Sequence, residues 1–213
     1  MIKIQTFTFN DFQENTYVLF DKTNECIIVD PGCYEKKEKI QLENFISDNK
    51  LKPILLVNTH CHIDHVLGNH FVSKSWNIPL AMHKLDLPTL KSVADYCSIY
   101  GFHNYEQSPE PKLFLKENDV INFGNSSLKV LFTPGHAPGH IVLHSSEQNF
   151  IIGGDVLFKL SIGRTDLPGG DHDTLIQSIK EKLIPLHDDT TVYCGHGMPT
   201  NIGFEKQNNP FII

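Results

Sequence analysis

The feature that most limits what this chain can fold into is the segment NTHCHIDHVLGNH at residues 58–70, which follows the apolar run ILLV at residues 54–57. An apolar run of this kind is typical of a strand buried on both faces. The segment after it carries potential metal ligands in the pattern H-x-H-x-D-H: His60, His62, Asp64 and His65. In an extended loop, His60 and His62 project to the same side and can bind one ion. We expect the loop to turn into a helix at Asp64, which aims the last two ligands toward a neighbouring ion position.

Three later segments offer the further ligands that two metal ions need. Each candidate follows an apolar strand-like run and lies among glycines: His136 after residues 127–132, Asp155 after residues 150–152 and His196 after residues 191–194. Glycine lets the backbone approach a site closely, and ligand sites in sheet proteins gather beyond the carboxyl ends of strands. The sequence therefore predicts one ion held by His60, His62 and His136, a second held by Asp64, His65 and His196, and Asp155 between them.

The donor set predicts the kind of metal. Imidazole and carboxylate ligands without thiolate suit zinc, iron or manganese, and they suit a catalytic centre better than a closed structural one. We expect two divalent ions, zinc first, with iron or manganese as alternatives. The remaining histidines are interpreted as packed or surface residues. For His140, orienting a ligand and a purely structural role stay equally open. Cys61 is expected to point away from the ligands.

Composition and charge exclude several classes of partner. The chain has 213 residues with 18 basic and 25 acidic side chains, a formal charge of −7. Nucleic acids and anionic membrane surfaces are excluded because binding them needs a basic patch, and no apolar stretch is long enough for a transmembrane helix. The five cysteines form no CxxC pair, which is typical of reduced thiols in the cytoplasm. The opening residues also lack the pattern of a secretory signal.

The order of the expected elements indicates the fold class. We expect strands at residues 3–9, 16–20, 26–29, 54–57, 79–82, 120–123, 127–132, 140–144, 150–152 and 191–194. Helices are expected at residues 36–49 and 66–76, at residues 174–183 with Asp173 as the cap, and, followed by a polar loop, within residues 84–112. Strands come first, helices intervene, strands return, and a helix and a strand close the chain. This order fits two packed sheets with helices outside. No stretch has the composition of a linker, so we predict one domain over residues 1–213.

These motifs resemble those of the metallo-β-lactamase-fold hydrolases. The THxHxDH signature at residues 59–65 is followed in the family's order by His136, Asp155 and His196, and the resemblance includes the DxPG turn at residues 30–32. It implies an α+β fold, a four-layer αβ/βα sandwich of two mixed sheets with a dinuclear site at one edge. TPGHAPGH and the segment GGDVLFKLSIGRTDLPGGD are similar to the short glyoxalase II-like branch. That branch implies a hydroxyacylglutathione hydrolase-like thioesterase.

The leading hypothesis is a dinuclear-metal hydrolase that cleaves a small-molecule thioester, S-lactoylglutathione or a related acyl-thiol, by a metal-bridging hydroxide. Asp64 and Asp155 would set the positions of the ions and the nucleophile. Two interpretations of Arg164 stay open: it binds a substrate carboxylate while Asp166 holds it in place, or the two side chains only stiffen their loop. The alternative functions are a mononuclear-iron persulfide dioxygenase and a non-catalytic metal-binding module. The pattern does not specify the acyl group or the oligomeric state.

Overall fold

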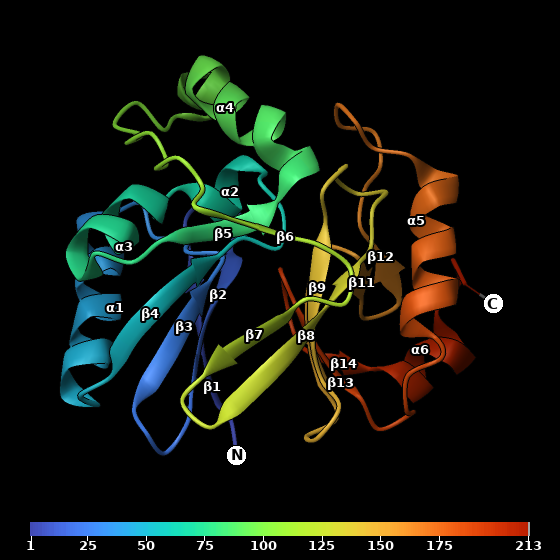
Figure 1. Ribbon diagram of the computed structural model, residues 1–213. Coiled ribbons are helices and arrows are strands. Elements are labelled where there is room, and N and C mark those ends of the chain that lie inside the picture. Colours follow the sequence, from blue (N-terminus) through green and yellow to red (C-terminus); the bar gives the residue numbers. More distant parts are fainter. Residues whose placement is uncertain (213) are drawn as a thin grey trace. The chain divides into compact units, whose positions relative to one another are not determined.

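The structure is a computed structural model that describes residues 1–212, and the chain divides into two compact units. The first unit comprises Met1–Leu115 with Asn122–Ser126, and the second comprises Lys116–Ile121 with the chain from Ser127 onward. Each unit contains one six-stranded sheet and its own helices (Figure 1). The predicted α+β class with two mixed sheets is therefore confirmed. The single domain over residues 1–213 stays a prediction.

The sheet of the first unit has the strand order β1-β2-β3-β4-β5-β6. Its strands are β1 (Lys3–Phe9), β2 (Glu14–Phe20), β3 (Glu25–Val29), β4 (Lys52–Val57), β5 (Leu80–His83) and β6 (Leu113–Leu115). The first three strands form the predicted antiparallel meander. From β3 to β6 all neighbours are parallel, so the carboxyl ends of β3, β4 and β5 come to the same edge of the sheet.

Four α-helices belong to the first unit: α1 (Lys36–Asp48), α2 (Ile63–Val66), α3 (Asn69–Trp76) and α4 (Leu87–Tyr96). Two short 3₁₀ helices, Lys84–Asp86 and Cys97–Tyr100, flank α4. Leu42 and Ile46 of α1 are buried in one cluster with Ile28 and Leu56 of the sheet. The prediction of one helix over residues 66–76 was wrong, because the helical structure is interrupted between α2 and α3, at Gly68. The Gly68 N–H donates to the Pro31 carbonyl oxygen at 2.7 Å, and a Cβ there would lie 2.5 Å from Cys33 Sγ.

The sheet of the second unit has the order β14-β13-β10-β9-β8-β7. Its strands are β7 (Val120–Phe123), β8 (Ser126–Phe132), β9 (Ile141–Ser145), β10 (Phe150–Gly154), β13 (Thr191–Cys194) and β14 (Thr200–Asn201). A separate hairpin joins β11 (Leu157–Phe158) to β12 (Ser161–Ile162). Both β8 and β10 are antiparallel to β9, and β10 is parallel to β13. Strands β8, β10 and β13 therefore run in one direction and end at one edge.

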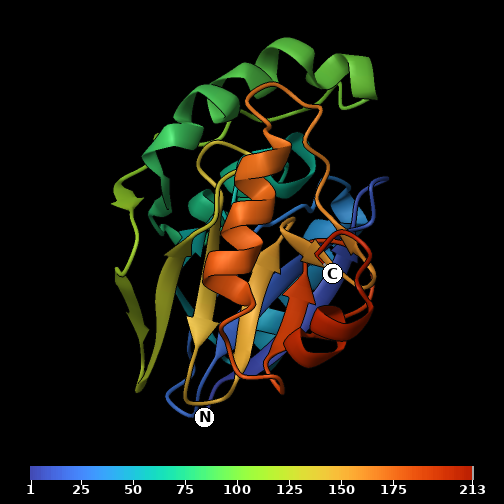
Figure 2. The same ribbon diagram turned by 90° about the vertical axis from the view of Figure 1, so that its right-hand side faces the viewer.

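Two helices, α5 (His172–Ser178) and α6 (Ile202–Asn208), accompany this sheet. Figure 2 shows α5 lying along one face of the sheet, with α6 beside β14. A π-helical turn, Ile179–Leu183, continues α5, and its apolar side chains pack on the sheet. The predicted cap at Asp173 was wrong: Asp171 is the N-cap, and its side chain accepts a hydrogen bond from the Thr174 N–H.

Residues 122–126, at the tip of the β7–β8 hairpin, are held by Asp21. The Asp21 carboxylate accepts hydrogen bonds from Asn125 N at 2.7 Å and Ser126 Oγ at 2.9 Å. It also accepts from the Thr23 hydroxyl and N–H. Desolvation raises the pKa of Asp21, but these hydrogen bonds lower it more, so its folded-state pKa lies well below 3.8.

Candidate metal centre

The four ligand candidates of the first unit follow the buried strand β4, as predicted. His60, Asp64 and His65 are buried, and His62 is half-buried. We call His60, His62, Asp64 and His65 the first half-set. Because β3, β4 and β5 are parallel, the carboxyl end of β4 lies between those of its neighbours. Asp30 follows β3 and Asp86 follows β5, so one buried carboxylate follows the strand on each side of β4.

Asp30 fixes the orientation of two imidazoles in the first half-set. Its Oδ2 accepts from His65 Nδ1 at 3.2 Å and from the Thr59 hydroxyl at 2.5 Å. The Thr59 oxygen in turn lies 3.1 Å from His60 Nδ1. With both Nδ1 atoms engaged as donors, Nε2 of each ring is the atom available to a metal. His65 Nε2 lies 3.5 Å from Asp64 Oδ2.

Ligand-type atoms of Asp30, His60 and His65 lie within 4.8 Å of one another. The hydrogen bonds argue against Asp30 as a third ligand. Its Oδ1 accepts the Thr59 N–H at 2.7 Å, and its Oδ2 accepts the two donors described above. A carboxylate that holds histidine N–H groups in this way orients ligands rather than binding the ion.

The backbone of the ligand loop is held by side chains that are distant in sequence. Asp86 Oδ2 accepts the Cys61 N–H at 2.7 Å. Asn10 Nδ2 donates to the Asp64 carbonyl oxygen at 3.0 Å, and Asn58 Nδ2 donates to the His65 carbonyl oxygen at 3.1 Å. A ligand loop fixed at several main-chain atoms is preorganised, so less conformational entropy is lost when an ion binds.

The three candidates of the second unit lie at one edge of its sheet. His136 follows β8, Asp155 follows β10 and His196 follows β13. These strands run in one direction, and the Gly195 N–H donates to the Gly154 carbonyl oxygen at 2.7 Å, which joins two of the loops. We call His136, Asp155 and His196 the second half-set.

Distances within the second half-set fit ligands of shared ions. Asp155 Oδ2 lies 3.6 Å from His136 Nε2 and 3.5 Å from His196 Nε2. Two ligand atoms bound to one zinc ion at about 2.0–2.1 Å in tetrahedral geometry are roughly 3.4 Å apart. His136 Nδ1 donates to the Arg164 carbonyl oxygen at 2.7 Å, which directs Nε2 toward Asp155. The donor atoms present in this unit therefore suit a divalent metal.

His140 holds the main chain of Asp155, and both roles considered for it from the sequence, orienting a ligand and a purely structural role, stay open. Its Nε2 accepts the Asp155 N–H at 3.0 Å, and its Nδ1 lies 3.2 Å from Thr133 Oγ1. A ring that accepts at Nε2 carries its proton on Nδ1, so it donates to the threonine oxygen. The fully buried His140 thus connects β8 to the ligand loop after β10.

Arg164 and Asp166 form a bidentate pair. Arg164 Nε and a terminal nitrogen each donate to an Asp166 oxygen at 2.7 Å. Hydrogen bonds from Arg164 lower the pKa of Asp166 to about 2. Both side chains are largely exposed. This pairing is expected under both interpretations of Arg164, substrate binding and loop stiffening. The main-chain oxygen of Arg164 contacts the ligand candidate His136.

The cysteines near the ligands are buried thiols. Cys61 Sγ lies 3.8 Å from Met82 Sδ, and burial raises the pKa of Cys61 well above its usual value. Burial also raises the pKa of Cys194 to about 12. Thiols in this state supply no thiolate at neutral pH, which agrees with the predicted imidazole and carboxylate donor set.

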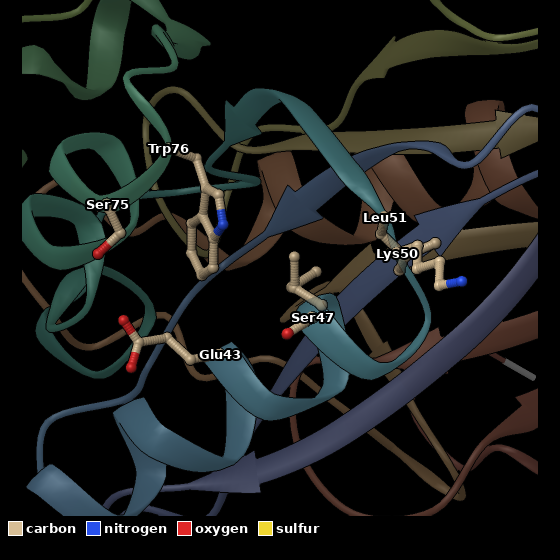
Figure 3. Close-up of a pocket in the computed structure, with 7 residues that line it drawn as sticks. Glu43, Ser47, Lys50, Leu51, Ser75 and Trp76 are labelled. Atoms are coloured by element: carbon tan, nitrogen blue, oxygen red, sulfur yellow. The ribbon is translucent and has the colours of Figure 1, made fainter.

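A surface groove of about 410 Å³ lies elsewhere in the first unit, between the ends of α1 and α3. Figure 3 shows Trp76 on one side of it, facing Glu43 and Ser47 of α1. The groove contains none of the ligand candidates, and its lining combines opposite charges with an aromatic ring. It has no donor set for a metal, so it is not the candidate centre.

Sequence reasoning missed three buried acidic residues beside the first half-set: Glu14, Asp30 and Asp86. The carboxyl group of Glu14 accepts from the Thr16 hydroxyl at 2.9 Å, and burial raises its pKa well above the usual value. A signal existed for Asp30 and Asp86, since both follow strands parallel to β4. From the sequence, Asp30 is noted only as part of the DxPG turn, and Asp86 looks like an ordinary turn residue.

Comparison with known proteins identifies relatives over nearly the whole chain. The family described as "Metallo-beta-lactamase superfamily" matches residues 9–196. Hydroxyacylglutathione hydrolase GloC of Haemophilus influenzae is 36% identical over 206 residues, 94% of this chain and 93% of the relative. The probable metallo-hydrolase YqgX of Bacillus subtilis is 36% identical over 204 residues, 94% of this chain and 92% of the relative.

Solved structures show the same fold. The chain is similar to BLEG-1 B3 metallo-beta-lactamase, with 33% identity, a TM-score of 0.88 and coverage of 100% of this chain and 99% of the other. It is also similar to TTHA1623 in a di-iron-bound form, with 33% identity, a TM-score of 0.87 and coverage of 97% and 99%. The predicted metallo-β-lactamase fold is confirmed. Among residues 1–212, no helix is both long and apolar enough to cross a bilayer.

Proposed function

We propose that this chain, which belongs to the metallo-β-lactamase superfamily, hydrolyses the thioester bond of an acyl-glutathione such as S-lactoylglutathione. The observation that carries the proposal is the match to a relative named hydroxyacylglutathione hydrolase along 94% of this chain. The two half-sets support it, because both present imidazole and carboxylate donors at the ends of strands. The chain spans 93% of that relative, so the likeness is not confined to one segment.

The proposed centre combines the two half-sets around two divalent ions. One ion is held by His60, His62 and His136, the second by Asp64, His65 and His196, and Asp155 is shared. Zinc is the first candidate, and iron or manganese remain alternatives. A relative that is 33% identical has been solved with two irons, which supports testing iron beside zinc.

When bound, two such ions supply a hydroxide nucleophile at neutral pH and stabilise negative charge on the reacting carbonyl. The chain's own residues contribute position. Asp30 holds the His65 ring, and the Arg164 carbonyl holds the His136 ring, so both face their ligand positions without rearrangement. Loss of a thiolate needs no dedicated general acid, because the parent thiol has a pKa of only about 8.5.

The remaining features of the proposal follow from charge and chemistry. A small-molecule thioester is the partner, since a net charge of −7 disfavours nucleic acid and anionic membranes. Five buried free cysteines favour the cytoplasm as the compartment. Arg164, held by Asp166, is proposed to bind a carboxylate of the substrate, because its guanidinium is exposed and matches a carboxylate bidentately.

The test uses protein stripped of metal and reconstituted separately with zinc and with iron. Each form is assayed with S-lactoylglutathione, a non-glutathione acyl thioester, a β-lactam, and glutathione persulfide in an oxygen electrode. We expect thioester hydrolysis and two metal ions per chain. Asp155→Ala should lower hydrolysis by more than about a hundredfold, since even outer-shell changes cost 10–100-fold. The control Asp189→Ala changes a largely exposed carboxylate and should retain full activity.

Three outcomes would overturn the proposal. Oxygen uptake with the persulfide and one iron per chain would indicate a dioxygenase. Hydrolysis of the β-lactam alone would indicate a lactamase, the class named for a relative that is 33% identical. Metal binding without turnover of any substrate would indicate a non-catalytic module.

A further inference from the structure

The β11–β12 hairpin, together with the two residues after it, contacts the second half-set. The carbonyl oxygen of Arg164 accepts the hydrogen bond from His136 Nδ1 at 2.7 Å. Gly163 packs on Asp155 so closely that a Cβ there would lie 1.9 Å from the Asp155 carbonyl oxygen. The position of this segment therefore determines how His136 and Asp155 present their ligand atoms.

The same hairpin also contacts the third member of the half-set. The centroid of the Phe158 ring in β11 lies 6.3 Å from that of the His196 ring. The Leu157 carbonyl oxygen accepts from Cys194 Sγ at 3.3 Å, which ties β11 to the end of β13. A shift of the hairpin would thus change the positions of all three ligand candidates of the second unit.

The side chain of Leu160, in the turn of this hairpin, does not hold the turn in place. Leu160 has a left-handed backbone, with φ at +59°, which a leucine adopts only at a cost. Its side chain is 45% exposed, so burial of apolar surface contributes little to holding it. Such a conformation persists only where the surrounding structure fixes it.

Glu205, a fully buried residue of α6, fixes this turn. Its Oε2 accepts from the Leu160 N–H at 2.9 Å and from Asn209 Nδ2 at 2.8 Å, and its Oε1 accepts from the Thr200 hydroxyl at 2.5 Å. Asn209 Nδ2 also donates to the Ser161 carbonyl oxygen at 3.0 Å. A buried carboxylate is costly unless it is hydrogen-bonded in this way, and here the hydrogen bonds converge on the hairpin.

We propose that Glu205 is a positioning residue of the metal centre. By fixing the turn at Leu160, it sets the place of the Arg164 carbonyl oxygen, which holds the tautomer and direction of His136. This inference rests on the proposed function, because it requires that the second half-set binds a metal ion. It goes beyond that function in assigning to a residue of α6, which carries none of the ligands, an effect on the metal affinity of the half-set.

Three variants separate this role from a general contribution to folding. Glu205→Ala removes the acceptors for all three donors. Glu205→Gln keeps a carbonyl oxygen for Leu160 and Asn209, while its NH₂ can donate to the Thr200 oxygen, because a hydroxyl both donates and accepts. Lys206→Gln is the matched control: it lies next in the same helix and loses only contacts to Leu186 and Asp188.

Two readouts are measured on each folded variant. The first is the NMR signal of the His136 Nδ1–H in metal-free protein, and the second is the dissociation constant for zinc measured with a competing chelator. We expect Glu205→Ala to lose the protected Nδ1–H signal and to bind zinc about 10–100-fold more weakly, as for other outer-shell changes. Glu205→Gln should stay within about threefold of the wild type, and Lys206→Gln should be unchanged in both readouts.

If Glu205→Ala does not fold, Asn209→Ala tests the same connection, since it removes the donor to Ser161 while Glu205 remains. A folded Glu205→Ala or Asn209→Ala variant that keeps both the Nδ1–H signal and the wild-type zinc affinity overturns the inference. If the wild type binds none of zinc, iron and manganese, the proposed function fails instead. The Nδ1–H signal of the metal-free proteins then still decides whether Glu205 positions His136.

Discussion

Replacing Gly163 with alanine tests the close packing on which the second half-set depends. The glycine has no left-handed backbone, so the substitution introduces no conformational strain of its own. The effect of the substitution is steric, because there is no room for a Cβ at this position. The new Cβ would lie 1.9 Å from the Asp155 carbonyl oxygen and 3.1 Å from His136 Nδ1. One change thus presses on two ligand candidates at once.

The size of the effect follows from these distances. Since a Cβ does not approach a heavy atom closer than 3.0 Å, the backbone has to move by at least 3.0 − 1.9 = 1.1 Å. Overpacking of a close-packed interior costs roughly 1–3 kcal/mol. The shift would also strain the hydrogen bond from the Gly163 N–H to the Val156 carbonyl oxygen, worth about 1 kcal/mol. We expect a loss of about 2–4 kcal/mol in the free energy of unfolding.

Thermal unfolding of metal-free protein measures this loss, which corresponds to a fall in Tm of roughly 4–16 °C. Gly153→Ala is the matched control. That glycine also has no left-handed backbone. A Cβ there would meet Val192 Cγ1 at 3.2 Å and the Tyr193 carbonyl oxygen at 3.4 Å, an ordinary contact distance. The free energy of unfolding of the Gly153→Ala variant should differ from that of the wild type by less than about 1 kcal/mol. Equal Tm values for the two variants would refute the packing argument.

Two further predictions concern the first unit. Asp30→Asn should weaken zinc binding about 10–100-fold. Asp30 accepts from His65 and Thr59 with both of its oxygens, whereas an amide has one acceptor oxygen and a nitrogen that only donates. Unchanged affinity in a chelator competition would count against the orienting role of Asp30. Asp21→Asn should flatten the acid dependence of stability in urea unfolding. The folded-state pKa of Asp21 is below 3.8, so its contribution is present above that value and is lost as pH falls through the folded pKa. Parallel acid profiles of variant and wild type would contradict this.

The main strands were predictable because each carries its own local signal. The alternation of apolar and polar residues in β1 and the continuous apolar run in β4 each indicate a strand from the local sequence alone. Strands β6, β11, β12 and β14 were missed. They have only two or three residues each, and they exist because of partners far along the chain, which no local pattern encodes.

Helix α6 was missed although the sequence offered a start signal. Asn201 is its N-cap, and the asparagine side chain accepts from the Phe204 N–H at 2.8 Å. Asparagine is among the preferred residues at this position. The cap predicted at Asp173 failed for a related reason: aspartates at both 171 and 173 suit an N-cap, and only the entry of the chain from the preceding loop selects Asp171.

Ligand candidates and the groups that orient them differ in how far a sequence can reveal them. A histidine after an apolar strand is visible because the residue type is rare and strand direction brings such ends together. The second half-set follows that rule through β8, β10 and β13. The group that orients His136, in contrast, is the main-chain oxygen of Arg164. Every residue has such an oxygen, so its role depends on the place of the hairpin. That place depends on the buried carboxylate of Glu205, and only the folded chain brings these groups together.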